Sequence, residues 1–101
     1  MARIELCRLD HLDGDRLLVD TPDGDPVLVI RHGDEVHVID AMCPHQYAPL
    51  LGGDVDADGI LTCNLHGWRF RLSDGRSPDS EYIQVQRWPC GVEDGVVWIE
   101  E

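Results

Sequence analysis

Lysine is absent from the 101-residue chain, in which all eight basic residues are arginine. Twenty acidic residues stand against them, so the formal net charge at pH 7 is −12. Nucleic acids and anionic membrane surfaces attract basic proteins, and this charge therefore argues against both as partners. It favours a protein partner that has a basic docking face.

Long apolar runs are missing as well. The longest ones, such as Val27–Ile30, are far too short to cross a bilayer, and the N-terminus lacks the apolar region of a signal peptide. We therefore expect a cytoplasmic protein, in which the four cysteines are thiols or metal ligands rather than disulfides. The chain also lacks a Ser-His-Asp set, a phosphate-binding loop and a dinucleotide fingerprint.

Pairs of aspartate and glycine punctuate the chain at short intervals and predict tight turns. Between the turns lie stretches rich in β-branched and aromatic residues, several of them with apolar residues at every second position. This spacing predicts one all-β domain over residues 1–101, an antiparallel sandwich or barrel. One short helix is expected around residues 8–13, with Asp10 as its N-cap. Strands are expected at Arg16–Asp20, Pro26–Arg31, Glu35–Ile39, Gly59–Cys63, Trp68–Leu72, Ile83–Arg87 and Val96–Ile99.

Two loop-like segments, residues 43–52 and 63–68, carry no formal charge in this acidic chain. The first contains Cys43-x-His45 and the second contains Cys63-x-x-His66. Seventeen residues separate His45 from Cys63, enough for a hairpin that brings the loops side by side at one end of a sheet. One thiolate and one imidazole from each loop suit a [2Fe-2S] centre in which two cysteines hold one iron and two histidines hold the other.

Imidazole ligands make such a centre easier to reduce. Two ferric ions, two sulfides, two thiolates and two neutral imidazoles sum to no net charge, whereas four thiolates leave the oxidised centre already negative. The mixed ligand set therefore raises the reduction potential to roughly −150 to +300 mV, against about −400 mV for plant-type ferredoxins with four cysteines.

The motifs Cys43-Pro44-His45 and Cys63-Asn64-Leu65-His66-Gly67-Trp68 resemble the paired motifs of Rieske-type [2Fe-2S] ferredoxins, and their separation is similar too. The chain length and the Cys-Pro-His-Gln opening resemble the soluble ferredoxins of bacterial aromatic-ring oxygenase systems. The resemblance implies a Rieske-type fold with a small cluster-binding subdomain, residues about 42–70, at one tip. It also implies that Cys43 and Cys63 bind the buried iron of one [2Fe-2S] cluster, and His45 and His66 the outer iron.

The same resemblance implies a function. Such a ferredoxin passes single electrons from an NADH-dependent flavoprotein reductase to a terminal aromatic-ring mono- or dioxygenase, and it is not itself an enzyme. The high charge and the small size favour a free monomer that docks its partners transiently at the cluster tip. The sequence names neither these partners nor the substrate of the pathway.

The chain departs from the high-potential members of the family at four positions. Respiratory Rieske proteins carry an extra cysteine in each loop, whereas this chain has Ala48 and Leu65 there. Those relatives also place a serine and a tyrosine after the second motif, where this chain has Trp68 and Phe70. Fewer hydroxyl donors to the cluster leave its reduced state less stabilised, so we expect a potential toward the low end of the Rieske range. Such a potential favours an NADH-linked electron chain.

Other candidate residues are expected to be structural. Cys7 and Cys90 are taken as small core residues, and His11, His32 and His37 as surface or hydrogen-bonded histidines. Trp88 and Trp98 are expected in the core or on a sheet face, and Trp68 either beneath the cluster loops or at their rim. An apolar collar around the cluster is expected from Pro44, Tyr47, Pro49, Leu50, Leu51 and Leu65, with Pro78 on a third loop.

Two alternatives remain open. One is a Rieske-type small subunit of a larger oxidoreductase, such as a nitrite or arsenite oxidoreductase. The other is a zinc-stabilised binding module, although zinc sites of this ligand set usually pair two cysteines and then two histidines, and the order here alternates.

Overall fold

The computed structural model describes residues 3–44, 49–64 and 67–100. Within them the chain forms ten β-strands and two short 3₁₀ helices. In chain order they are β1 (Arg3–Arg8), η1 (Leu9–His11), β2 (Arg16–Asp20), β3 (Pro26–His32), β4 (Glu35–Asp40), η2 (Leu50–Gly52), β5 (Asp54–Val55), β6 (Ile60–Thr62), β7 (Arg69–Arg71), β8 (Arg87–Trp88), β9 (Cys90–Glu93) and β10 (Val96–Glu100).

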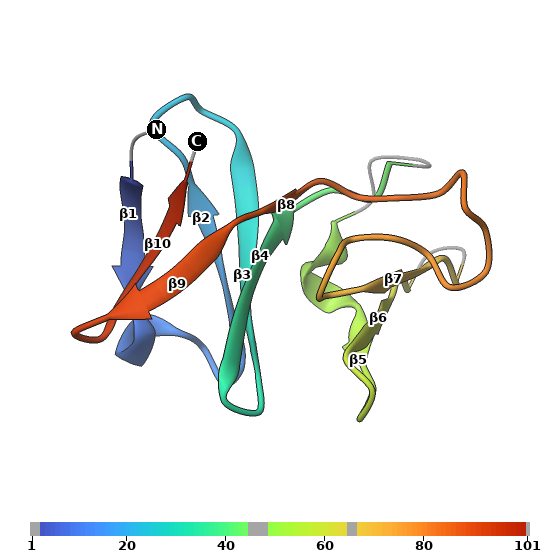
Figure 1. The fold of residues 1–101 in the computed structure, drawn as a ribbon, viewed down its shortest axis with the longest axis horizontal. Coiled ribbons are helices and arrows are strands. Elements are labelled where there is room, and N and C mark those ends of the chain that lie inside the picture. Colours follow the sequence, from blue (N-terminus) through green and yellow to red (C-terminus); the bar gives the residue numbers. More distant parts are fainter. Residues whose placement is uncertain (1–2, 45–48, 65–66, 101) are drawn as a thin grey trace.

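The strands make three antiparallel sheets, with the orders β1-β10-β9, β2-β3-β4-β8 and β5-β6-β7. The first two sheets pack together at one end of the molecule, and both chain ends lie there (Figure 1). The third sheet lies at the other end of the long axis (Figure 1). The all-β antiparallel architecture expected from the sequence is confirmed.

Strand β3 separates two apolar cores. Val27 and Val29 join Val38, Val97 and Ile99 in the base core, between the first two sheets. The alternate residues Leu28 and Ile30 face the opposite side and join the loop core, which also holds Ile39, Cys43, Leu50, Leu61, Cys63, Phe70, Leu72 and Val85. Successive side chains of a strand point to opposite faces. Because one core covers each face of β3, all four of these residues are fully buried. The uninterrupted apolar run Val27–Ile30 is thus a strand covered on both sides.

Several expected elements appear at or near their predicted bounds. The prediction is exact for Arg16–Asp20 and differs by one or two residues for β3, β4, β6, β7 and β10. The division into one domain with a subdomain at about 42–70 stays a prediction; that segment contains β5, β6 and the start of β7.

Two predictions about local structure are wrong, the strand at Ile83–Arg87 and the N-cap at Asp10. The segment Ile83–Arg87 is an irregular loop with one isolated bridge, Arg76↔Gln84, and a strand begins only at Arg87. Its backbone groups bond to other loops instead of a ladder: the Val85 N–H donates to the Gly75 carbonyl at 2.7 Å. The helix near residue 10 is a single 3₁₀ turn whose N-cap is Arg8, and Asp10 lies inside it, 3.4 Å from the Arg8 guanidinium.

Strands β1 and β9 were not expected. The first has apolar residues at alternate positions, Ile4 and Leu6, so the period-two signal was present. The second contains Gly91, which lowers β-propensity. The glycine is required there, because a Cβ atom at Gly91 would lie 2.5 Å from the Trp98 ring.

No helix in the described part of the chain is long and apolar enough to cross a membrane.

Candidate metal centre

The first cysteine loop leaves β4 and is closed by an antiparallel bridge. Met42 pairs with Pro49, and the Leu50 N–H donates to the Ala41 carbonyl at 2.8 Å. Cys43 follows this closure directly and is only 2% exposed. The loop therefore begins with a thiol directed into the protein.

The second cysteine loop connects β6 and β7, whose last pair is Thr62↔Arg69. The Cys63 N–H donates to the Trp68 carbonyl at 2.7 Å, and the Gly67 N–H donates to the Cys63 carbonyl at 3.0 Å. Gly67 has a φ of 73°, in the left-handed region that glycine adopts without strain. Cys63 is 2% exposed, like Cys43.

The structure brings the two cysteines into one place. Both belong to the loop core, together with Leu50, Leu61 and Phe70. Two glycines let the segment after the first loop approach the second one closely. A Cβ at Gly53 would lie 2.6 Å from the Thr62 carbonyl oxygen, and one at Gly52 would lie 2.9 Å from Nδ2 of Asn64.

These residues fit the thiolate half of an iron–sulfur site. All four cysteines are described, and none forms a disulfide. Two buried thiols from neighbouring loops, set in an apolar core, are soft ligands in a site that excludes water. His45 and His66 lie outside the described residues, so the complete ligand set stays a prediction. Among the residues that are described, no group of three or more histidine, cysteine, aspartate or glutamate side chains could hold a metal ion.

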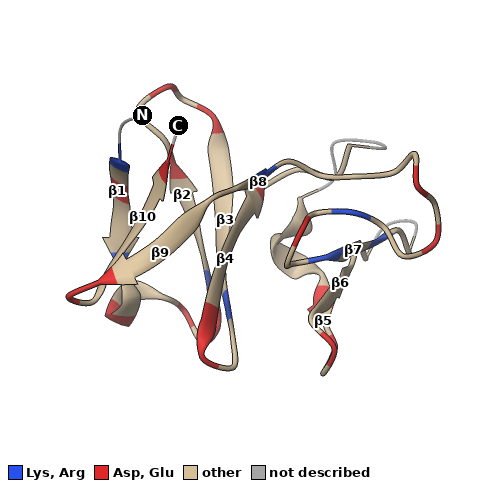
Figure 2. Ribbon diagram, viewed as in Figure 1, with Lys and Arg blue, Asp and Glu red and all other residues tan. Residues whose placement is uncertain are grey.

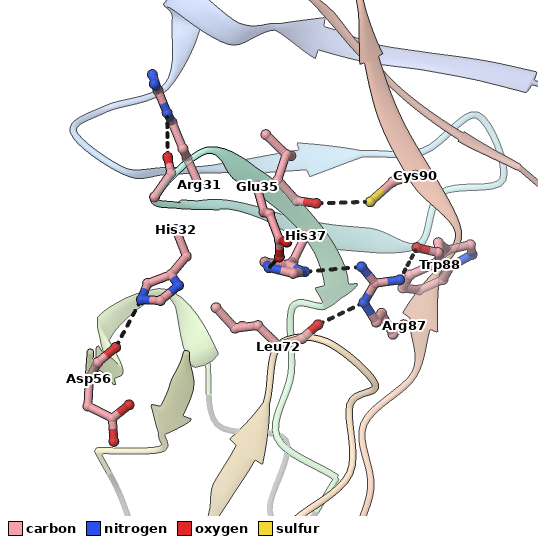
Figure 3. A network of polar contacts seen from close by, with 11 residues as sticks. Arg31, His32, Glu35, His37, Asp56, Leu72, Arg87, Trp88 and Cys90 are labelled. Carbon is pink, nitrogen blue, oxygen red and sulfur yellow. Dashed lines mark hydrogen bonds and ion pairs between the residues drawn. The ribbon is translucent and has the colours of Figure 1, made fainter. Parts of the chain in front are cut away.

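Two arginines of the sheet β2-β3-β4-β8, which we call part of the base together with the sheet β1-β10-β9, donate hydrogen bonds to the part of the chain that carries the cysteine loops. Nη1 of Arg16, on β2, donates to the carbonyls of Leu51 at 2.9 Å and Gly53 at 2.6 Å, at the end of η2. Nε of Arg87, on β8, donates to the Leu72 carbonyl at 2.7 Å (Figure 3). Arginine suits both positions because its fixed fork of N–H donors can satisfy several carbonyls at once.

Two histidines take part in the same junction (Figure 3). His32 Nε2 lies 3.1 Å from the Asp56 carbonyl oxygen, so β3 reaches the turn of the β5–β6 hairpin. His37 is buried, and its Nδ1 accepts from Nη2 of Arg87 at 3.0 Å. Burial and the Arg87 charge lower the pKa of His37, against the opposing effect of Glu35, and so favour its neutral form. Sequence reasoning missed these contacts, because the bonded residues lie 15 to 50 positions apart.

Comparison with known proteins decides the family. The Rieske [2Fe-2S] domain family matches residues 2–89 of the chain. The chain belongs to the Rieske family. It is 33% identical over 97 residues to the ferredoxin component of the alkene monooxygenase system of Xanthobacter autotrophicus, covering 95% of this chain and 79% of that one.

Solved structures agree with this membership. The ferredoxin of carbazole 1,9a-dioxygenase from Nocardioides aromaticivorans IC177 superimposes with a TM-score of 0.82 at 29% identity, covering 98% of this chain and 97% of that one. A putative NADH-dependent nitrite reductase small subunit from Mycobacterium tuberculosis gives a TM-score of 0.86 at 24% identity over 97% and 93%, which shows the shared fold.

The cofactor of this Rieske protein is therefore a Rieske-type [2Fe-2S] cluster. The chain is a ferredoxin-type electron carrier rather than a catalyst.

The other residues predicted near the cluster differ in how far they are exposed. Trp68 is partly buried and packs on the loop core. Pro44, Pro49 and Leu51 are exposed, as expected of a collar, and Tyr47 and Leu65 lie outside the described residues. Leu50 is fully buried, because the closing bridge of the first loop turns it into the loop core beside the cysteines. Its place in the collar stays a prediction.

Most of the residues expected to be structural lie against the base core or on a sheet face. Cys7 and Cys90 are partly buried against the base core, and burial raises the pKa of both thiols. Cys90 Sγ donates to the Val36 carbonyl at 3.3 Å (Figure 3). Trp88 packs on the base core, and Trp98 lies on a sheet face under Arg3, whose Cζ is 3.9 Å from the ring centre. Pro78 is exposed on the loop between β7 and β8.

Proposed function

We propose that the chain carries single electrons from an NADH-dependent flavoprotein reductase to a terminal aromatic-ring mono- or dioxygenase. Cys43, His45, Cys63 and His66 hold the cluster in this proposal. One observation carries it: Cys43 and Cys63, each the first member of a Cys/His motif, are buried together in one apolar core by two different loops. The names of the similar ferredoxins, which belong to an alkene monooxygenase and a carbazole dioxygenase, support the oxygenase partner.

The bound cluster supplies a one-electron couple, and the chain's own residues decide how electrons reach it. The two buried thiols hold the inner side, where the loop core keeps water out. His45 and His66 would hold the other iron. The exposed Pro44, Pro49 and Leu51 offer an uncharged surface to a partner. The described residues of both loops are uncharged, whereas acidic residues gather in the other turns (Figure 2).

The surroundings of the cysteines support a potential near the low end of the Rieske range. Phe70 is fully buried in the loop core and has no hydroxyl to donate to a sulfur atom. Each missing donor leaves the more negative, reduced state less stabilised. A low potential suits an electron chain that begins at NADH. A cytoplasmic monomer that docks transiently fits the high negative charge.

The first experiment is the EPR spectrum of the dithionite-reduced protein, with iron and acid-labile sulfide assayed on the same sample. We expect a rhombic signal of low average g, with two irons and two sulfides per chain. Cys43→Ser and Cys63→Ser are expected to abolish it. Cys7→Ser and Cys90→Ser are the matched controls and should keep it, because those thiols lie against the base core. A colourless protein that contains one zinc would refute the proposal.

A second candidate is a Rieske-type small subunit of a nitrite reductase-like enzyme. The fold of the nitrite reductase small subunit favours it, although the 24% identity speaks for the fold alone. Copurification of the native chain with a large subunit, together with failure to reduce any oxygenase, would select this candidate.

A further inference from the structure

A groove of about 380 Å³ lies beside the first cysteine loop, and the proposed function does not use it. Its walls come from the start of β3, the end of β4 with the residues that follow, and the chain entering β8. Pro44, which lies between the proposed ligands Cys43 and His45, is part of its rim. A group bound in this groove would therefore touch the loop that carries two of the proposed ligands.

The groove combines two carboxylates with apolar walls. Asp25 and Asp40 are its charged residues, and Pro26, Met42 and Trp88 provide apolar surface. Asp40 is held in place, because its Oδ1 accepts the Met42 N–H at 3.0 Å. Trp88 lines the groove and also packs on the base core. Its neighbour Arg87 points toward His37 and Leu72 (Figure 3).

Among the described residues, no cationic side chain pairs with these two carboxylates. No arginine lines the groove, and neither Asp25 nor Asp40 forms an ion pair with any described residue. Some acidic residues elsewhere pair with arginine, as in Arg3–Glu93, Arg16–Asp15, Arg69–Asp79 and Arg71–Asp74, whereas other exposed carboxylates, such as Asp23 and Asp58, form no ion pair with a described residue but do not line this groove. Two unpaired carboxylates at one groove favour a cation from outside the chain.

We propose that the groove binds an arginine side chain of the terminal oxygenase and so anchors that enzyme beside the first cysteine loop. The proposal rests on the proposed function. A planar guanidinium suits carboxylates next to an aromatic face, since it donates several hydrogen bonds and stacks on rings, while its aliphatic stem covers apolar surface. A metal ion suits the groove poorly, because hard cations need a shell of oxygen ligands and these walls are partly apolar. The oxygenase is the partner because the similar ferredoxins serve oxygenases.

The first test titrates the oxidised holoprotein with N-acetyl-arginine amide and follows ¹⁵N NMR signals of the Trp88 indole and the Gln84 and Gln86 amides. Saturable shifts confined to the groove are expected. N-acetyl-citrulline amide, which has the same shape without the charge, should cause none.

The double variant Asp25→Asn/Asp40→Asn should weaken arginine binding about tenfold, because it removes both charges and keeps the acceptor for Met42. Asp23→Asn/Asp58→Asn is the matched control, since it changes the net charge equally at two exposed positions outside the groove. Equal weakening in both double variants, or shifts spread over the whole acidic surface, would overturn the groove as a specific site.

The second test uses the reductase and oxygenase of the Xanthobacter alkene monooxygenase system in stopped-flow measurements. Asp25→Asn/Asp40→Asn should slow the bimolecular reaction with the oxygenase about tenfold and flatten its salt dependence, while the control variant stays near the wild-type rate. Slowing of the reductase step alone would overturn the assignment to the oxygenase.

The two proposals fail in different ways. A wild-type chain that shows the Rieske EPR signal but delivers no electron to the oxygenase would refute the proposed function and the oxygenase as occupant. The arginine titration would still decide whether the groove binds a guanidinium group.

Discussion

Arg87 joins three parts of the molecule, and its replacement by methionine is the most informative single change. Its guanidinium donates to the Leu72 carbonyl at 2.7 Å, to His37 Nδ1 at 3.0 Å and to the Trp88 carbonyl at 3.4 Å. Leu72 belongs to the loop core, with the two proposed cysteine ligands. His37 lies on β4 of the base. Arg87→Met removes these bonds, while methionine keeps much of the apolar contact of the arginine stem.

The expected loss of stability is about 3 kcal/mol. A hydrogen bond from a charged donor contributes about 1.5–3 kcal/mol, and a buried acceptor left unsatisfied costs about 1–3 kcal/mol. The long bond to Trp88 adds little. The Leu72 carbonyl and His37 Nδ1 both lose their donor, but Arg87 is only partly buried and water reaches part of this site. For a domain of this size, such a loss lowers Tm by more than about 10 °C.

The assay is thermal unfolding of the holoprotein, followed by visible absorbance of the cluster and by far-UV circular dichroism. Arg71→Met is the control, because Arg71 pairs with Asp74 at 3.3 Å on the surface and such a pair contributes at most about 1 kcal/mol. A Tm for Arg87→Met within 3 °C of the control (roughly half a kcal/mol by the same conversion) would refute the argument that Arg87 ties the loop core to the base.

Three further predictions concern pH, packing and the metal. The lowered pKa of His37 means that the unfolded chain binds more protons near and below pH 6.5. Stability should therefore fall as pH drops through this value, more in the wild type than in Arg87→Met or His37→Gln, and equal pH profiles in urea unfolding would contradict this. Gly53→Ala should cost about 1–3 kcal/mol in urea unfolding, because its Cβ would meet the Thr62 carbonyl, whereas Gly52→Ala, which meets only the flexible end of a side chain, should cost less. Removal of the cluster with a chelator under reducing conditions should lower Tm, since binding stabilises only the folded loops, and an unchanged Tm would count against the proposed site.

Local chemistry explains why much of the fold could be predicted. The aspartate and glycine turns and the β-branched runs between them are signals that neighbouring residues carry, and β2 appears with its predicted bounds. The segment Ile83–Arg87 has the same local signal and forms a loop, because its backbone donors find partners such as the Gly75 carbonyl. Gly91 lowers the β-propensity of the β9 segment, so propensity alone does not predict this strand. The glycine is there because the Trp98 ring lies where a Cβ atom would be.

Part of the candidate site could also be predicted from the sequence, and part could not. The alternating Cys/His motifs, their spacing and the family were readable from the sequence, because a [2Fe-2S] cluster demands particular ligands within short loops. That Leu50 turns inward, and that Arg16 and Arg87 hold the loop-bearing part by its carbonyls, followed only from the structure.

The sequence by itself determined the ligand types, the turns and the apolar run Val27–Ile30. Only the tertiary structure decided that this run separates two cores, and that Asp25 and Asp40 line one groove beside the first cysteine loop. The physical reason is distance along the chain. Ligand motifs and turns depend on residues a few positions apart, whereas cores, carbonyl ties and grooves arise where segments far apart in sequence pack together and must satisfy each other's polar groups.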